Sequence, residues 1–456
     1  MMAAFDTLAT LLGPRFATSD AARAQNGRNE AHFPEALPDA VAYPQTTAEV
    51  AAIVAACAAE GIPVTAIGAG TSLEGQHLAV RGGISLDFSR MDRVLAVNAE
   101  DLNVVIQPGI PRTALNEALR ATGLWFPIDP GADASLGGMA ATRASGTTAV
   151  RYGTMRENVL ALEAVMSDGT VIRTGTQARK SSAGYDLTHL LVGSEGTLGI
   201  ITELTLRLHG QPEGVLAAIC RFDDVEAAVN CVILTIQSGL PMARIEFLDE
   251  MMVRGFNLHS GGTLPETPHL FVEFHGTPAG VAEQAQSFRE IAEDFGMADW
   301  QEATTTEDRS ALWKMRHSAH YASAALRPGV RTLATDVCVP ISRLAEAITK
   351  AKALATEMGI IGTVVGHVGD GNFHYAVRFD PADPQDLART HDFAGRLNEL
   401  ALALGGTVSG EHGIGLGKQK YMGAEHGAAL DWMRRVKDAL DPKGILNPGK
   451  MLPPVA

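Results

Sequence analysis

The chain has 456 residues, of which 46% are hydrophobic and 20% charged, an ordinary globular composition for two or three domains. Acidic residues outnumber basic ones by 52 to 37, which argues against a nucleic-acid partner because binding a phosphate backbone needs clustered Lys and Arg. No apolar run reaches the roughly 18 residues of a membrane span, and residues 1–18 lack a secretion-signal pattern. We therefore expect a bacterial protein of the cytoplasm or of the inner face of the membrane.

The first half of the chain, up to about residue 210, is dense in Gly and small residues and begins with a βαβ pattern. A strand over 40–43 precedes a helix that Thr46 is expected to cap, with Glu49 completing a capping box. Gly61 ends this helix. A second helix is predicted over 113–121, and strands are predicted over 62–67, 84–87, 104–107, 160–166 and 200–208.

The second half begins near a Gly- and Pro-containing join at 210–214. Strands are predicted over 215–221, 243–248, 269–275, 332–339, 363–367 and 373–379, with helices over 224–237, 278–295, 306–326, 342–358 and 385–404. Strands separated by single helices, together with one tight hairpin, predict an open antiparallel sheet covered by helices on one face. The expected fold class is α+β.

Three glycine-rich segments in the first half are candidates for holding an anionic cofactor. The first, Gly68–Gly75, is not a Rossmann fingerprint, because its third glycine is misplaced. It is not a P-loop either, because Gln76 and His77 stand where Lys and Ser or Thr belong. Its small residues still expose backbone N–H groups that can form an anion nest. For this segment alone, a mobile turn is an equally good interpretation.

The other two segments favour the cofactor. In residues 129–153, Ser135 is expected to be a helix N-cap, and Gly137 and Gly138 would let a flat or anionic group approach the helix start closely. The third segment is Gly193–Ile201. Together the three segments suit a long cofactor that lies extended between two subdomains, with its diphosphate held mainly by backbone amides.

A pair of histidines indicates a metal site in the second half. In His367-Val-Gly-Asp-Gly-Asn-Phe-His374, the dipeptide Asp370-Gly371 is a strong two-residue hairpin signal. A hairpin of that kind would place His367 directly opposite His374, with their Cβ atoms roughly 5 Å apart on one face. A lone strand histidine is usually structural, but two at this register favour a shared metal.

A third ligand and an arginine are the next candidates for this site. Glu411 is the best third ligand, because Gly410 and Gly413 free the backbone to turn it and His412 inward. Two His and one carboxylate leave coordination positions open, as in catalytic sites. Arg316 and His320 are expected to share a helix face, and an Arg can hold a carboxylate through two parallel hydrogen bonds. A surface charge is the alternative for Arg316.

Three stretches carry a family resemblance: PVTAIGAGTSLEGQ (63–76), FPIDPGADASLGGMAATRASGTTAVRYGT (126–154) and KSSAGYDLTHLLVGSEGTLGIITE (180–203). From about residue 40 to its end, the chain resembles the flavin oxidoreductases of the vanillyl-alcohol-oxidase (PCMH) type. Within them it is similar to the branch that contains D-lactate dehydrogenase (cytochrome) and the glycolate oxidase large subunit.

The resemblance implies an FAD-binding domain of two subdomains over 1–211, a substrate- and metal-binding cap domain over 212–425, and a C-terminal segment over 426–456 that returns to the FAD domain. Several relatives attach the flavin to a His beside the first loop, but residues 68–72 contain none, so we expect non-covalent FAD. The candidate cofactor contacts are Gly68, Ala69, Gly70, Thr71, Ser72, Gly75, Gly131, Ala132, Ser135, Gly138, Ser145, Gly153, Gly196 and Ile201.

The resemblance also assigns roles in the second half. It implies that His367, His374 and Glu411 bind a divalent metal, either zinc or manganese. His412 would be the general base and Arg316 the arginine that orients the substrate carboxylate. The expected reaction oxidises a small D-2-hydroxy acid to the 2-oxo acid. The metal binds the carboxylate and hydroxyl, His412 takes the hydroxyl proton, and a hydride passes to FAD.

The choice of acid follows from two positions. Relatives that act on 2-hydroxyglutarate carry a Lys before the strand equivalent to 336–340 and a Thr in place of His320, whereas residues 332–335 offer no cation. A lactate-like monocarboxylic acid is therefore favoured, with glycolate and 2-hydroxyglutarate left open.

Other functions also fit this sequence. One is an FAD-dependent transferase of the same fold with no net oxidation. Others are a metal-dependent hydrolase or lyase without flavin, and a subunit that needs iron–sulfur partners. The four cysteines form no CxxC or CxxCH motif and are expected to be reduced and buried. Electrons would thus pass to an external acceptor such as a cytochrome, a quinone or an electron-transfer flavoprotein. The chain could form a homodimer.

Overall fold

The computed structural model describes residues 2–29 and 31–454. The first unit contains the chain up to Ser145, Gly153–Gln211 and the residues from Glu411 onward, and the second contains Gly146–Tyr152 and Pro212–Gly410. These bounds differ in two places from those expected, 1–211, 212–425 and 426–456. Residues 146–152 belong to the second unit, and the chain returns to the first at Glu411, where the backbone begins to bond to residues such as Glu74 and Glu195.

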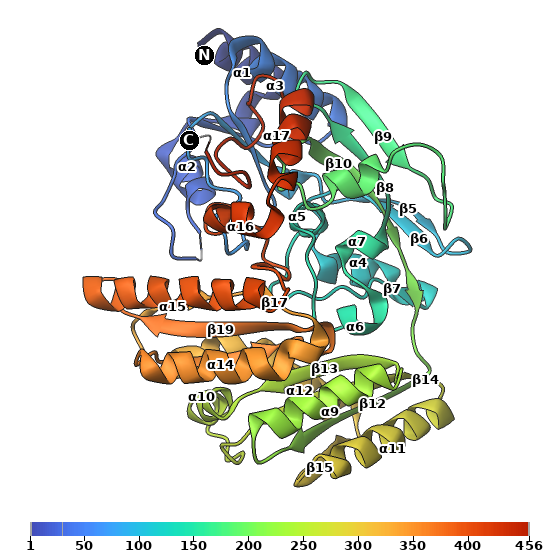
Figure 1. The fold of residues 1–456 in the computed structure, drawn as a ribbon. Coiled ribbons are helices and arrows are strands. Elements are labelled where there is room, and N and C mark those ends of the chain that lie inside the picture. Colours follow the sequence, from blue (N-terminus) through green and yellow to red (C-terminus); the bar gives the residue numbers. More distant parts are fainter. Residues whose placement is uncertain (1, 30, 455–456) are drawn as a thin grey trace. The chain divides into compact units, whose positions relative to one another are not determined.

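The first unit contains three sheets (Figure 1). A four-stranded sheet has the order β1 (Phe16–Ala17), β2 (Ala40–Ala42), β4 (Ile84–Asp87) and β3 (Val64–Ile67), with β2 and β3 parallel to β4. An antiparallel five-stranded sheet has the order β5 (Val94–Asn98), β6 (Asn103–Ile106), β10 (Ile200–Arg207), β8 (Val159–Val165) and β9 (Val171–Gly175). The third sheet pairs β7 (Leu124–Trp125) with β11 (His209–Gly210).

The helices of the first unit are α1 (Met2–Leu12), α2 (Asp20–Gly27), α3 (Thr47–Glu60), α4 (Arg112–Leu119), α5 (Leu136–Thr142), α7 (Met155–Asn158), α8 (Leu187–Leu191), α16 (Met422–His426) and α17 (Ala429–Leu440). One buried core lies between α1, α3 and the four-stranded sheet, and another packs α4 and α5 against the five-stranded sheet. Helix α3 begins after Thr46, whose side chain accepts from the Glu49 N–H at 3.2 Å. The expected capping box is incomplete, because Glu49 accepts from the N–H of Gln45 and pairs with Arg15.

The second unit is built on one antiparallel sheet of eight strands. Its order is β15 (Asp299–Ala303), β12 (Gly214–Arg221), β14 (His269–Gly276), β13 (Met242–Leu248), β18 (Gly362–Gly366), β19 (Asn372–Phe379) and β16 (Arg331–Ala334), and β17 (Val337–Cys338) also pairs with β19. Its helices are α6 (Ala149–Tyr152), α9 (Val225–Gln237), α10 (Glu250–Ser260), α11 (Pro278–Asp294), α12 (Thr306–His317), α13 (Ala319–Ala325), α14 (Leu344–Glu357) and α15 (Pro384–Ala403).

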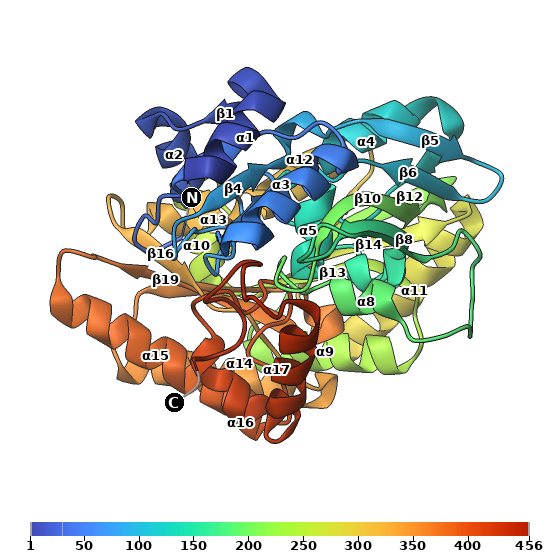
Figure 2. The same cartoon turned by 90° about the horizontal axis from the view of Figure 1, so that it is seen from above.

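The two faces of this sheet differ in chemistry. On one face, apolar residues such as Phe247 and Phe373 pack against α9, α11, α14 and α15. Helices α14 and α15 contact each other and are seen next to each other in Figure 2. On the other face, Leu248 and Phe271 pack against α10, α12 and α13. The expectation of helices on one face alone is therefore wrong, although the α+β class and the antiparallel sheet are confirmed. Because side chains alternate along a strand, Arg244, Glu246 and His374 lie on the face of α10, α12 and α13.

Two other expectations about the chain can be compared with the structure. The helix expected over 306–326 is interrupted at Ser318, which separates α12 from α13. Cys57, Cys220 and Cys231 are buried and Cys338 is half-buried, and all four are free thiols. Within 2–29 and 31–454, no helix combines the length and apolar character needed to cross a membrane.

Candidate metal and cofactor sites

The two histidines flank the connection between β18 and β19, but not in the expected register. His374 pairs with Val365, and His367 lies outside the strand, where its carbonyl accepts from the N–H groups of Asp370 and Asn372. Residues 368–370 form a 3-10 turn that ends at Gly371, whose φ is +79°. The expected two-residue hairpin is therefore wrong, because the turn takes up His367 and the next three residues.

The two imidazole rings still lie close together. Their centroids are 5.6 Å apart and their planes are nearly perpendicular, at 86°. Both side chains are largely buried. The longer turn thus gives the proximity that the hairpin was expected to give.

Each histidine is oriented through its Nδ1 atom. His367 Nδ1 lies 2.8 Å from Glu246 Oε1, and His374 Nδ1 lies 3.0 Å from the carbonyl oxygen of Thr335. An oxygen partner on one ring nitrogen fixes the tautomer and the ring plane, so that the opposite nitrogen can ligate a metal. This is the hydrogen-bonding arrangement typical of metal-ligating histidines.

Glu246 also binds Arg316. The arginine donates from Nε to Glu246 Oε2 at 2.8 Å, and its Nη2 is ion-paired with the same oxygen at 2.5 Å. Burial alone would raise the pKa of Glu246, but the charges of His367 and Arg316 more than offset it, so that the pKa lies below its ordinary value. Glu246 is therefore a buried carboxylate, held between the arginine and the histidine.

This contact changes the expected geometry of Arg316. Two of its guanidinium nitrogens are committed to Glu246, so the arginine cannot use its Nε and Nη2 edge for a substrate carboxylate while this ion pair persists. The side chain is buried rather than a surface charge. His320 does not share its face, because the helix is interrupted at Ser318 and His320 is exposed.

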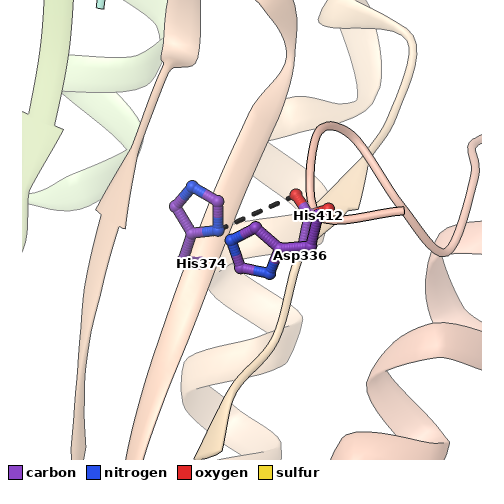
Figure 3. Close-up of side chains that lie close together, drawn as sticks. All are labelled: Asp336, His374 and His412. Carbon is purple, nitrogen blue, oxygen red and sulfur yellow. Dashed lines mark ion pairs between the residues drawn. The ribbon is translucent and has the colours of Figure 1, made fainter. Parts of the chain in front are cut away.

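Glu411 and His412 directly follow Gly410, the last residue of the second unit. Glu411 offers a ligand atom within 4.8 Å of those of His367 and His374. A second group, Asp336, His374 and His412, meets the same limit. Figure 3 shows these three side chains gathered together, with Asp336 ion-paired to His374 at 3.8 Å.

Asp336 belongs to the segment between β16 and β17 and is fully buried. Its carboxylate accepts from Asn372 Nδ2 at 2.8 Å and from Ser409 Oγ at 2.9 Å. These bonds join the strand that bears His374 to the segment that leads into Glu411. Asp336 therefore helps to gather the candidate ligands from different parts of the chain.

The segment after His412 is anchored within the first unit. Gln76 Nε2 donates to the His412 carbonyl at 2.6 Å, and Glu195 accepts from the N–H groups of Ile414 and Gly415 at 2.6 and 2.9 Å. Burial raises the pKa of Glu195, although these N–H donors oppose the rise. A residue directly after the first glycine-rich segment and one within the third thus hold the loop that follows the candidate base.

The three glycine-rich segments meet one another in the first unit. Ser135 stands at the N-cap position of α5, but its hydroxyl accepts from the Ala69 N–H of the first segment at 3.3 Å and makes no cap. The third segment bonds to α5 through Gly193 N–H to the Ala140 carbonyl, at 2.9 Å. Helix α5 therefore lies where all three segments come together, the first segment at its start and the third near its end.

The backbone of these segments is open to a ligand at some glycines, whereas a Cβ at Gly68 or Gly137 would meet Ser135 or Pro108. A Cβ at Gly131 would meet no protein atom within 4 Å, and one at Gly196 would reach only Ala66 Cβ, at 4.0 Å. Gly70 has φ +72°, a conformation that favours glycine. The segments therefore fit an extended cofactor that approaches the main chain closely. The other expected contacts in these stretches, Thr71, Ser72, Gly75, Ala132, Gly138, Ser145 and Gly153, together with Ile201 on β10, also belong to this unit.

Sequence reasoning missed three carboxylates, Glu195, Glu246 and Asp336. Glu246 did leave a signal, because Arg244 and Glu246 alternate with apolar residues along a strand and thus define one polar face. The partners of all three are far away in the sequence; His367, for example, is 121 residues from Glu246. Pattern reasoning finds such residues but not what they bind.

Two family models match the chain. The model described as "FAD binding domain" covers residues 38–175, and that described as "FAD linked oxidases, C-terminal domain" covers residues 211–451. A Danio rerio protein named "Probable D-lactate dehydrogenase, mitochondrial" is 49% identical over 95% of this chain and 88% of its own length. The Arabidopsis thaliana "D-lactate dehydrogenase [cytochrome], mitochondrial" is 44% identical over 98% of this chain and 79% of its own.

A solved structure supports the fold. That of p-cresol methylhydroxylase with substrate bound superposes with a TM-score of 0.82 over 98% of this chain and 96% of its own. The two sequences are 16% identical. At that level the likeness speaks for a shared architecture and not for a shared substrate.

Proposed function

The chain belongs to the family of FAD-linked oxidases, and from this premise we propose that it oxidises D-lactate, or a closely similar D-2-hydroxy acid, to the 2-oxo acid. The names of its relatives supply the substrate class. The observation that carries the chemistry is the group His367, His374 and Glu411, whose ligand atoms lie within 4.8 Å of one another. Two imidazoles and one carboxylate suit zinc or manganese and leave positions for substrate oxygens.

In this proposal, three residues of the chain have separate roles in the reaction. His412 takes the proton of the substrate hydroxyl, and its neighbour Glu411 completes the ligand set. Arg316 orients the carboxylate through the part of its guanidinium outside the Glu246 ion pair. When bound, FAD supplies the electron sink and the metal supplies a Lewis acid that makes the hydroxyl easier to deprotonate.

We further propose that the flavin is held without a covalent bond. His77, just beyond the first glycine-rich segment, has both ring nitrogens engaged. Nδ1 lies 3.0 Å from Ser72 Oγ, and Nε2 lies 2.8 Å from the Arg28 carbonyl. An imidazole with these two bonds has no ring nitrogen to spare for a flavin link.

The proposal also covers the electron acceptor and the cellular location of the protein. Relatives named "D-lactate dehydrogenase [cytochrome]" favour a cytochrome, with a quinone or an electron-transfer flavoprotein as other acceptors. We place the protein in the cytoplasm or at the inner face of the membrane, as a homodimer. The chain's excess of 52 acidic over 37 basic residues suits a basic protein partner better than an acidic one.

A panel of D- and L-2-hydroxy acids, mixed with the protein without oxygen, tests the proposal. Bleaching of the yellow flavin by D-lactate, with little response to L-lactate or D-2-hydroxyglutarate, is the expected result. Net reduction of an electron-accepting dye then excludes the transferase alternative. A protein that purifies colourless would instead favour a hydrolase or lyase, and turnover only with an added iron–sulfur partner would favour the subunit alternative.

A further inference from the structure

Glu246 makes contacts that ordinary packing does not require. Its side chain is 1% exposed, on the sheet face that also carries His374. One carboxylate oxygen lies 2.8 Å from His367 Nδ1, and the other accepts from Arg316 Nε at 2.8 Å and is ion-paired with Arg316 Nη2 at 2.5 Å. A single side chain thus bonds to a candidate metal ligand and to the candidate substrate arginine.

The chemistry of such a contact is specific. A carboxylate on the far nitrogen of a metal-ligating histidine fixes the ring and makes it a stronger ligand. A carboxylate against a guanidinium edge fixes the plane of the arginine, and with it the direction of its remaining donors. Because both partners share one rigid planar group, neither can rotate without disturbing the other.

We propose that Glu246 is a positioning residue that aligns the metal ligand His367 and the substrate-binding Arg316 with each other. The inference rests on the proposed function. It adds that metal affinity and recognition of the substrate carboxylate are set by the same buried carboxylate. Loss of Glu246 should therefore weaken both, although Glu246 touches neither metal nor substrate.

A buried carboxylate could instead act only as a structural tie, and Glu273 separates the two possibilities. It lies on β14, the strand next to β13, and is 5% exposed. It accepts from Trp313 Nε1 at 2.5 Å, on the same helix as Arg316, and lies 2.8 Å from His275 Nε2. Its partners are Trp313, His275 and Arg244 rather than His367 and Arg316, so Glu273→Gln removes a comparable buried charge away from the metal ligands.

The test is a titration of Zn²⁺ into chelator-treated, flavin-loaded protein, followed by calorimetry, for the wild type, Glu246→Gln and Glu273→Gln. Glutamine keeps the shape but offers one acceptor oxygen for two partners. We expect Glu246→Gln to bind zinc roughly 10- to 100-fold more weakly than wild type and Glu273→Gln to bind it as wild type does. Equal zinc affinity in wild type and Glu246→Gln would overturn the inference and leave the metal site standing. If wild type binds no zinc, the metal part of the proposed function fails first.

The proposed effect of Glu246 on Arg316 is tested by a separate measurement. At saturating zinc, the KM for D-lactate should rise in Glu246→Gln and stay unchanged in Glu273→Gln. An unchanged KM in Glu246→Gln would overturn the claim that Glu246 positions Arg316. If Glu246→Gln does not fold, Glu246→Asp replaces it, because Asp keeps the charge but is one methylene too short to reach both partners. It should then show the same two losses to a smaller degree, and normal values for both would refute the inference.

Discussion

His367 and His269 are both buried histidines next to or within the large sheet, but their surroundings differ. His367 lies against Glu246 and near His374. His269 Nδ1 lies 2.7 Å from the Thr267 carbonyl, and among the described residues His269 belongs to neither candidate ligand group. We predict that His367→Ala abolishes dye reduction with D-lactate while the protein stays yellow. His269→Ala, the matched control, should keep its activity. Absorbance spectra and steady-state assays of both variants provide the check; loss of flavin from His367→Ala would contradict the assigned roles.

Arg316 should be sensitive even to the conservative change to Lys. A lysine keeps the charge but cannot bond Glu246 through two nitrogens and still direct another donor at a substrate. Losing one charged hydrogen bond costs ~1.5–3 kcal/mol, so Arg316→Lys should raise the KM for D-lactate roughly ten- to a hundredfold. Arg309→Lys, on the same helix, serves as the control. A KM equal to that of the control would return Arg316 to a structural role.

At the scale of elements, the connection between β18 and β19 decides where the histidines point. Gly371 ends the 3-10 turn with φ +79°, and a Cβ there would lie 2.2 Å from the Val339 carbonyl oxygen. Gly359 has φ +64°, but a Cβ there would meet no atom within 4 Å. Both changes to Ala carry the cost of a left-handed backbone, about 1–2 kcal/mol, and only Gly371→Ala adds a clash.

We therefore predict that Gly371→Ala lowers both thermal stability and zinc affinity, and that Gly359→Ala lowers stability by the smaller, purely conformational amount with zinc affinity intact. Thermal unfolding and zinc titration of the pair measure the difference. Equal zinc affinity in the two variants would mean that the turn does not position His367.

The same elements show what sequence can predict. Long apolar-periodic segments were found nearly in full: the helices predicted over 224–237 and 278–295 correspond to α9 and α11. The hairpin prediction failed because Asp370-Gly371 is a turn signal that says nothing of the three residues before it, 367–369, which leave the strand as well. α10 was missed, and with it the cover on the second face of the sheet.

The residues of the candidate site likewise fall into those that local sequence motifs reveal and those that only tertiary contacts reveal. Residues in strong local motifs, such as His374 and Glu411, could be proposed from the sequence, because the motif itself places the chemistry. Glu246 and Asp336 could not be assigned, because their roles depend on partners that only folding brings near. The candidate cofactor segments were recognisable as glycine-rich, but their meeting at α5 depends on tertiary structure.

At the scale of the whole chain, the C-terminal segment completes the first unit. Asn447 Nδ2 donates to the carbonyls of Gln76 and Glu195 at 2.9 and 2.7 Å, and Lys450 Nζ donates to the Leu78 carbonyl. Residues more than 250 positions apart are thus bonded together around the first and third glycine-rich segments. Stability of this unit should therefore depend on the C-terminal segment.

Lys450 makes that dependence measurable through pH. Burial lowers its pKa to about 8, against 10.5 in the unfolded chain, and Glu195 opposes the shift. Between these values the unfolded chain binds more protons, so Lys450 makes stability rise with pH across about 8 to 10.5. The rise is roughly 3 kcal/mol. Lys450→Met should flatten it in urea unfolding at a series of pH values, whereas the exposed Lys443→Met should not. A Lys450→Met profile parallel to wild type would refute the assignment.

The central claim is that flavin reduction by a D-2-hydroxy acid needs a metal held by His367, His374 and Glu411. The most direct measurement follows the flavin absorbance of chelator-treated protein without oxygen, first with D-lactate alone and then after Zn²⁺ or Mn²⁺ is added. We predict a flavin that stays oxidised until the metal is present and then bleaches. Bleaching at full rate before any metal is added would contradict the claim.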